Sequence, residues 1–381
     1  MDLFEANEKL GKKLYITGKG RCNVTNACEP NEVLGNVVSN NKFLYSSLYS
    51  FTSYDTITFF ENLGVPIKIE RGNRAFPESD KSSDVISALK RYLDKSGVNV
   101  MLNTKVLDVQ KINNLFIINT ISGMYKDYDA TIICTGGCTY SATGSTGDGL
   151  KLAEKFGHTI TPIKAGLVPI LIKDNFVKSL EGLSLKNVTL KAYVKNKPFK
   201  EFFGEMLFTS NGISGPIALS LSSYITKQED VRLFLDFKPA LSYEKLLARL
   251  NRDILQLKEK QVNTLMQGLL PKAFVNVFLK RLNIDCSRKN KTLLAREIEQ
   301  IVSLLKCFEL QYNGLDKLDF GIITSGGVSV KEIDPKTMQS KIISGLYFAG
   351  EVIDIDALTG GFNLQLAWST AMTVANNIKS N

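Results

Sequence analysis

The first part of the chain, residues 1–164, alternates short apolar runs with amphipathic stretches. Residues 3–6 predict a strand. Residues 83–95 predict a helix that stops before Gly97, because four apolar side chains fall on one face of it: Val85, Ile86, Leu89 and Leu93. Such alternation of strands and helices is typical of a doubly wound α/β domain with a largely parallel sheet.

Two later strands of this domain end at glycines. Residues 129–135 predict a strand followed by a turn at Gly136 and Gly137, and residues 148–156 predict the next helix. Residues 346–349 predict a strand that ends at Gly350 and Glu351, and the pair Gly360 and Gly361 then opens a helical segment. A carboxylate at a strand end can accept hydrogen bonds from hydroxyl groups, and the amides of a helix N-terminus can face an electron-rich atom.

The middle of the chain has a different pattern. Residues 165–240 are rich in predicted strands, and residues 241–316 are helical, with Pro271 expected at the first position of a helix. We therefore predict four segments: a first part of the α/β domain (1–164), a β-rich insert (165–240), a helical insert (241–316) and a C-terminal return to the α/β domain (317–381).

Composition indicates an ordinary globular chain of 381 residues, 44% hydrophobic and 22% charged, with a net charge of +9. No apolar run approaches the roughly 18 residues that span a bilayer, and there is no apolar leader, so we expect a cytoplasmic location without a membrane partner. Residues 241–300 hold twelve basic and six acidic side chains. A solvated helical surface explains this excess, and a nucleic-acid footprint is the alternative.

Cysteine and histidine restrict the chemistry. The six cysteines form neither a CxxC pair nor a zinc pattern, so we predict reduced structural thiols and no metal site. The single histidine, His158, follows Gly157 at the end of a predicted helix. A helix-end or surface role is therefore favoured over catalysis, and no catalytic residue is assigned.

Five segments together resemble a known family. They are GKKLYITGKGRCNVTN, RGNRAFPESDKSSDV, DATIICTGGCTYSATGSTGDGLKLAEKFG, LFTSNGISGP and SGLYFAGEVIDIDALTGGFNLQLAWSTA. In this order they are similar to the bacterial BaiN/YhiN-like, or aminoacetone-oxidase-like, FAD-binding flavoproteins. The resemblance implies a Rossmann-like FAD domain of the glutathione-reductase type with inserts, and FAD as cofactor.

The chain departs from that family at its start. No GxGxxG turn precedes Asp2, so the first strand-turn-helix, about 20 to 30 residues, is missing relative to the family pattern. Residues 3–6 resemble the second strand. On this interpretation we expect a truncated chain, or a start placed too late, that binds FAD weakly and is unstable.

The resemblance and the helix-terminus argument assign the cofactor contacts. Glu5 matches the acid that binds the adenosine ribose, Glu351 matches the strand-end acid for the ribityl hydroxyls, and the amides of the second glycine pair face the flavin ring. The complete set expected to bind FAD is Glu5, Lys19, Gly20, Arg21, Cys22, Asn23, Thr135, Gly136, Gly137, Gly350, Glu351, Gly360, Gly361, Phe362 and Asn363.

The function predicted is an FAD-dependent oxidoreductase that moves a hydride through flavin N5 between a small organic substrate or NAD(P)H and a second acceptor. The resemblance admits a reductase of unsaturated or steroid-like compounds and an amine or aminoketone oxidase. NAD(P)H use stays open, since no second dinucleotide fingerprint is present. The alternatives are an RNA-interacting flavoprotein of the tRNA-modification type, which the charge fraction argues against, and an inactive truncated remnant. The sequence does not fix the oligomeric state.

Overall fold

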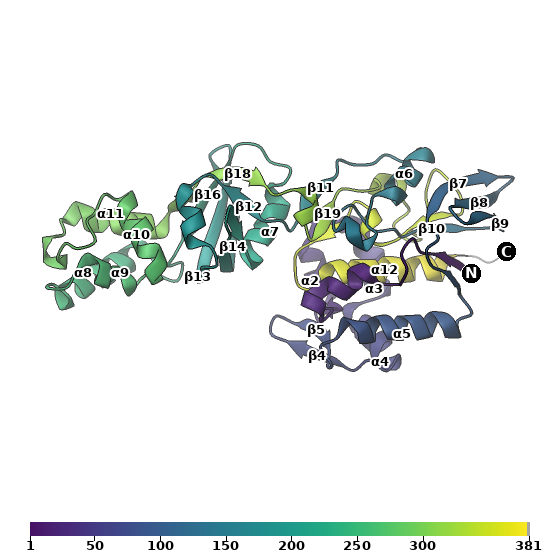
Figure 1. Cartoon of the computed structure of the whole chain (residues 1–381), viewed down its shortest axis with the longest axis horizontal. Coiled ribbons are helices and arrows are strands. Elements are labelled where there is room, and N and C mark those ends of the chain that lie inside the picture. The colour runs from purple at the N-terminus through teal and green to yellow at the C-terminus, as the bar shows by residue number, and fades with distance from the viewer. Residues whose placement is uncertain (379–381) are drawn as a thin grey trace. The chain divides into compact units, whose positions relative to one another are not determined.

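The computed structural model describes residues 1–378 and divides into two compact units (Figure 1). Unit 1 comprises Met1–Gly166 and the chain from Leu318 onward, and unit 2 comprises Leu167–Lys317. The chain thus passes from unit 1 to unit 2 between residues 166 and 167, and returns to unit 1 between residues 317 and 318. No helix within residues 1–378 is both long enough and apolar enough to cross a bilayer.

Unit 1 holds the parallel strands that position the site. Strand β1 (Asp2–Phe4) pairs with β6 (Asn99–Met101), and β10 (Thr131–Ile133) pairs with β20 (Leu346–Phe348), both in parallel. Within the described residues these two pairs form separate sheets. Since parallel strands end at a common edge, the residues after β10 and β20 lie together.

Two three-stranded antiparallel sheets and two antiparallel strand pairs complete the β structure of unit 1 within the described residues. Strand β2 (Thr25–Asn26) pairs with β5 (Arg74–Pro77), which pairs with β4 (Ile67–Glu70). The others are β7 (Val106–Ile112), β8 (Leu115–Thr120) and β9 (Gly123–Tyr128), the pair β3 (Val37–Ser39) and β21 (Asp356–Ala357), and the pair β11 (Lys164–Gly166) and β19 (Ile323–Ser325).

Apolar helix faces close the core of unit 1. Helix α5 buries Val85 and Ala88, and α12 buries Phe362, Leu366 and Val374. The helices of this unit are α1 (Lys12–Ile16), α2 (Pro30–Gly35), α3 (Tyr45–Ser50), α4 (Ser53–Asn62), α5 (Ser82–Lys95), α6 (Asp148–Lys155) and α12 (Phe362–Asn377).

Unit 2 combines an antiparallel sheet with helices over one core. The sheet order is β17-β16-β13-β14-β15-β12-β18. Its strands are β12 (Ile170–Ile172), β13 (Ser184–Val194), β14 (Lys197–Phe208), β15 (Gly212–Ser214), β16 (Val231–Asp236), β17 (Phe308–Leu310) and β18 (Tyr312–Leu315), and its helices are α7 (Pro216–Ile225), α8 (Tyr243–Gln256), α9 (Val262–Gln267), α10 (Lys272–Arg281) and α11 (Ala295–Lys306). Strands and helices share one hydrophobic cluster, so the further division near residue 240 stays a prediction.

Two local expectations need correction. Pro271 is the N-cap of α10, with ψ of 139°, and not its first helical residue. His158 does follow the end of α6, but the residue is only 3% exposed, so a surface role is wrong. Apolar side chains such as Phe348 pack over the ring, a tertiary contact that the local sequence does not encode.

Candidate functional site

Three acidic or thiol side chains mark the carboxyl ends of the parallel strands. Glu5 follows β1, and its Oε1 accepts hydrogen bonds from the backbone N–H of Asn7 at 2.8 Å and from Asn7 Nδ2 at 2.7 Å. Asn7 Nδ2 also donates to the carbonyl oxygen of Thr143 at 3.2 Å. Glu5 is thereby fixed to the loop before α6, and its other carboxylate oxygen can accept from a ligand.

The thiol after β10 lies in a confined but solvent-reached place. Cys134 is exposed, yet burial by the surrounding protein raises the pKa of its thiol, with a further contribution from the charge of Glu5. Solvent exposure and a pKa raised by burial are compatible if protein surrounds most of the Cys134 side chain and water reaches the rest of it. Thr135 follows, and Gly149 of α6 approaches it so closely that an added Cβ would lie 2.0 Å from Thr135 Oγ1.

Glu351 sits at the centre of a polar cluster. Its Oε1 accepts from the backbone N–H of Thr324 at 2.7 Å, and its Oε2 lies 3.0 Å from Lys13 Nζ. Lys13 also donates to Thr139 Oγ1 at 3.1 Å. Gly137 belongs here because a Cβ on it would lie 2.1 Å from Thr324 Oγ1.

Two neighbouring glycines, Gly350 and Gly136, lie beside the polar cluster around Glu351. Gly350 has a left-handed φ of 73°, and its N–H donates to Thr370 Oγ1 of α12 at 3.0 Å. Gly136, with φ of 75°, passes close to Ser145, whose Oγ lies 3.5 Å from Lys13 Nζ. The structure thus brings Gly136, Gly137, Gly350 and Glu351 together, as the sequence predicts, and adds Lys13.

The N-terminus of α12 offers unbonded amides. Gly360 and Gly361 have φ of 130° and 100°, and a Cβ on Gly361 would lie 2.4 Å from the carbonyl carbon and oxygen of Thr25. The first hydrogen bond onto this turn is from Gln365 N–H to Gly361 O. Within residues 1–378 no acceptor takes the N–H groups of Phe362, Asn363 and Leu364.

The side chains at this helix start have structural roles. Asn363 Nδ2 donates to the carbonyl oxygen of Ala357 at 2.8 Å, and its Oδ1 accepts from Ala357 N–H at 2.9 Å. Phe362 is 7% exposed and packs in the core. The side chains of these two residues are thus engaged in the fold, and their backbone N–H groups are left for a ligand.

The GKGRC loop has an unusual backbone. Gly18, Lys19, Gly20 and Cys22 all take left-handed φ values between 57° and 85°, of which two fall on residues other than glycine. Lys19 is exposed, and nothing lies within 4 Å of the space that a Cβ on Gly20 would fill. Cys22 is fully buried, and burial raises the pKa of its thiol to about 11, so its thiol does not ionise at neutral pH. Asn23 Oδ1 is buried and has no hydrogen-bond partner among residues 1–378.

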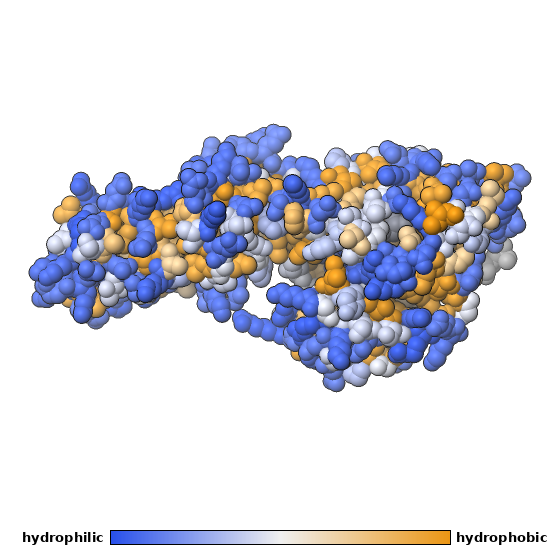
Figure 2. All heavy atoms as spheres, viewed as in Figure 1, coloured by the Kyte–Doolittle hydropathy of each residue, from blue (hydrophilic) through white to orange (hydrophobic). Residues whose placement is uncertain are grey.

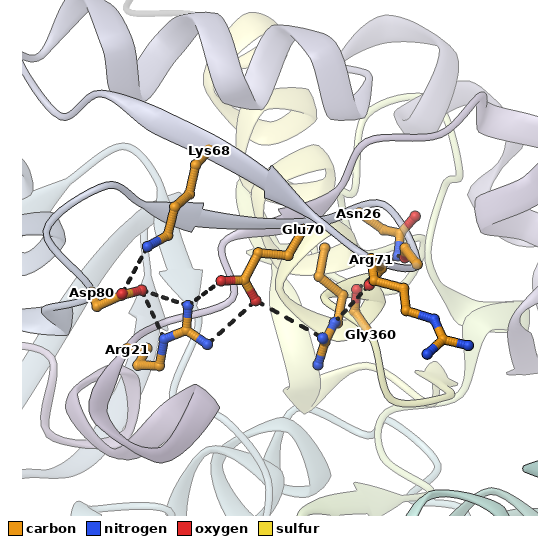
Figure 3. Close-up of polar contacts among 9 residues, drawn as sticks. Arg21, Asn26, Lys68, Glu70, Arg71, Asp80 and Gly360 are labelled. Carbon is orange, nitrogen blue, oxygen red and sulfur yellow. Dashed lines mark hydrogen bonds and ion pairs between the residues drawn. The ribbon is translucent and has the colours of Figure 1, made fainter.

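Arg21 turns away from that loop into an ion network (Figure 3). Its guanidinium contacts Glu70 at 2.5 Å and Asp80 at 2.5 Å, and lies 4.1 Å from the ring centre of Phe76. Lys68 Nζ lies 2.7 Å from Asp80. Hydrogen bonds from Arg21 lower the pKa of Glu70, and those from Lys68, followed by Arg21, lower the pKa of Asp80. The side chain expected at the cofactor thus holds the β4–β5 hairpin, and a role in cofactor binding stays a prediction.

Within residues 1–378, potential metal ligands do not cluster and the single histidine is bonded within the fold. No three His, Cys, Asp or Glu side chains gather there to hold a metal ion. His158 Nε2 lies 2.8 Å from Ser340 Oγ, and its Nδ1 lies 3.3 Å from Glu332 Oε2 without hydrogen-bond alignment. Asp354 and Asp356, which would be solvated in an open loop, are 8% and 1% exposed.

Sequence reasoning missed three residues of the site: Lys13, Asn26 and Thr324. Lys13 and Asn26 lie inside a segment that carries the family resemblance, whereas Thr324 lies outside all five segments. None of the three is a glycine, strand-end acid or helix start. Asn26 Nδ2 donates to the carbonyl oxygens of Gly72 and Gly360, each at 3.0 Å, and so joins two loops far apart in sequence. Only tertiary proximity makes these residues functional candidates.

The comparisons with known proteins show the family to which the chain belongs. Residues 1–377 match the family model described as HI0933-like protein Rossmann domain, and the chain belongs to that family. The expected α/β class with a Rossmann-like, FAD-dependent oxidoreductase domain is therefore confirmed, as is the resemblance from which it came.

Three curated relatives cover almost the whole chain. A ribosomal RNA dihydrouridine synthase of Haemophilus influenzae is 30% identical over 99% of this chain and 92% of that protein. The protein of the same name from Escherichia coli is 30% identical over 99% and 91%. A 3-dehydro-bile acid delta(4,6)-reductase of Clostridium scindens is 27% identical over 97% and 90%.

The residues present fit the flavin end of FAD. The buried, unpartnered Asn23 Oδ1, the three unbonded amides of α12 and the enclosed but solvent-reached Cys134 are what a polar, planar ligand would satisfy or cover. Glu351 with Lys13 would hold hydroxyl or phosphate groups, and Glu5 a ribose hydroxyl. The individual contacts remain predictions.

We predict that Lys13 and Glu351 act as a unit. Lys13→Met and Glu351→Gln should each destabilise the folded chain, and the double variant should lose less than the sum, with a coupling of about 1 kcal/mol or more. Both side chains are about one-quarter exposed, at 24% and 23%, so solvent screens the pair only partly. Denaturant unfolding of the four forms measures the coupling.

The control is the pair Lys155 and Asp108, which is more exposed at 57% and 27%. Its coupling should stay within the roughly 0.2–1 kcal/mol of exposed ion pairs. Additive losses for Lys13 and Glu351 would show that the cluster does not exist as described.

Proposed function

We propose that this chain is an FAD-dependent reductase of a carbon–carbon double bond conjugated to a carbonyl group, and that its substrate is a uracil base in RNA. Both activities named for the relatives, dihydrouridine synthesis and bile-acid delta(4,6)-reduction, reduce such bonds. The proposed reaction class is thus common to these relatives, and the uracil substrate is the more specific part of the proposal.

The single observation that carries the flavin part is the start of α12. Three amides without acceptors, at the positive end of a 16-residue helix, stabilise negative charge on a group placed before them. An interaction of up to about 2 kcal/mol would raise a two-electron potential by about 40 mV, at roughly 30 mV per 1.4 kcal/mol. FAD, when bound, would accept a hydride from the electron donor and pass it to the substrate.

The reaction balances without any metal. Reduction of uracil breaks the C5=C6 π bond, forms one C–H bond with a hydride equivalent and a second with a proton, and draws two electrons from a reduced nicotinamide or another two-electron donor. The chain would orient the base, exclude water and stabilise charge on the carbonyl oxygen. A lysine, a tyrosine or water would donate the proton, since the His158 ring is buried and its Nε2 is bonded to Ser340.

Charge in unit 2 supports an RNA substrate. Figure 2 shows hydrophilic residues along the outer end and edges of the helices α8–α11, with hydrophobic ones between them. Several exposed basic side chains there form no ion pair with any described residue: Lys245, Lys258, Lys260, Lys272, Lys280 and Arg296. Unpaired cations of this kind contact phosphates. With two relatives named for ribosomal RNA, they move the RNA hypothesis ahead of the small-molecule one that the charge fraction favours.

The second candidate is reduction of a small unsaturated ketone of the steroid type. The relative from Clostridium scindens supports it. It uses the same flavin site and needs no cationic surface.

One experiment separates the two. The FAD-loaded chain, reduced under anaerobic conditions, is offered in vitro transcribed ribosomal RNA and, in parallel, a 3-oxo-Δ4 steroid. We expect the RNA digest to contain a nucleoside heavier than uridine by two hydrogen atoms. Steroid reduction with unchanged RNA would replace the proposal by the second candidate, and reduction of neither would contradict both.

A further inference from the structure

The β4–β5 hairpin carries one cation that the ion network does not use. Glu70 and Asp80 bind Arg21 and Lys68, and Arg74 lies 3.9 Å from Glu70. Arg71, at the hairpin tip, is exposed, and its guanidinium contacts no residue among 1–378 (Figure 3). Its carbonyl oxygen accepts from Arg74 Nε at 3.1 Å, which fixes the backbone at the tip.

The tip is tied to the start of α12. Asn26 Nδ2 donates both to Gly72 O, next to Arg71, and to Gly360 O, each at 3.0 Å. The backbone N–H of Ala27 donates to Asn73 O at 2.6 Å. Strand β2, which supplies Thr25 and Asn26, pairs with β5 on one side and meets Gly361 on the other.

We propose that Arg71 is a substrate-binding residue that holds a phosphodiester of the RNA beside the uracil being reduced. The braced turn fixes the backbone from which Arg71 projects, and the planar guanidinium binds phosphate in bidentate fashion, with little entropy lost for each hydrogen bond. Arg21 is the positioning residue, because its bonds to Glu70 and Asp80 hold the hairpin that carries Arg71. This inference rests on the proposed RNA substrate.

The test measures binding and needs no turnover. A fluorescein-labelled, single-stranded RNA of mixed sequence with a central uridine is titrated by anisotropy from about 50 to 200 mM salt. The protein forms are the parent, Arg71→Ala, Arg71→Lys and the control Lys126→Ala, which removes an exposed, unpaired lysine of β9 in the same unit.

We expect Arg71→Ala to bind about tenfold more weakly and to lower the slope of log K against log salt by about 0.7, as for one lost single-strand phosphate contact. Arg71→Lys should keep the slope and recover part of the affinity, since it retains the charge without the fork. Lys126→Ala should behave as the parent. Melting curves identify any variant that misfolds. If Arg71→Ala misfolds, the affinity of Arg71→Lys is compared with that of the parent instead.

The outcomes distinguish this inference from the proposed function. RNA binding that is equal in the parent and Arg71→Ala, in affinity and slope, overturns the role of Arg71 and leaves the RNA substrate standing. A parent that binds no RNA overturns both.

Discussion

Replacing Gly361 by valine should abolish FAD binding and unfold the start of α12. Gly361 has φ of 100°, and a Cβ would lie 2.4 Å from the carbonyl carbon and oxygen of Thr25. The backbone strain costs about 1–2 kcal/mol, and overpacking typically adds about 1–3 kcal/mol. We expect a large fall in melting temperature and no retained flavin after dialysis.

The control for backbone strain is Gly97→Ala. Gly97 also has positive φ, 66°, but nothing lies within 4 Å of the added Cβ. That variant should lose only about 1 kcal/mol and keep its flavin. A Gly361→Val chain with parental melting and flavin content would show that the contact with Thr25 is wrong.

Replacing His158 by alanine should destabilise the fold by about 2–4 kcal/mol, through the cavity and the lost bond to Ser340. Turnover of the folded, FAD-loaded enzyme should change only a few-fold. General acid–base catalysis contributes about 100-fold or more, so a hundredfold loss of kcat with unchanged melting would make His158 the proton donor. Melting and steady-state rates on the same preparation separate these cases.

The same residue predicts a pH dependence of stability. Burial lowers the pKa of His158, and the charge of Glu332 only partly opposes this. The unfolded chain therefore binds a proton that the folded chain does not, so stability should fall as pH drops below the ordinary histidine pKa of about 6.5. His158→Phe should lack this loss between about pH 6.5 and 5, where no other side chain of ordinary pKa titrates.

Local sequence was sufficient for the elements that frame the site. The apolar run before Gly350 and Glu351 predicted β20, and the glycine pair predicted the start of α12, because strand ends and helix starts depend on neighbours in sequence. Helices α5 and α6 followed from apolar periodicity, to within one residue at each end.

Partners far apart in sequence could not be predicted in this way. Arg21 was expected at the cofactor, but Glu70 and Asp80 bind it after the β4–β5 hairpin folds over the loop. Lys13 meets Glu351 across 338 positions, and Asn26 meets Gly360 across 334. Burial of His158 likewise depends on Ser340 and Phe348, which are far from it in sequence and contact it only in the folded chain.

Equilibrium dialysis of FAD against the folded 381-residue chain measures whether it binds the cofactor. At about 100 µM FAD even a weakened site with a Kd near 10 µM is about nine-tenths occupied, so we expect close to one FAD per chain with perturbed visible bands. A chain that melts cooperatively yet retains no FAD under these conditions would contradict it.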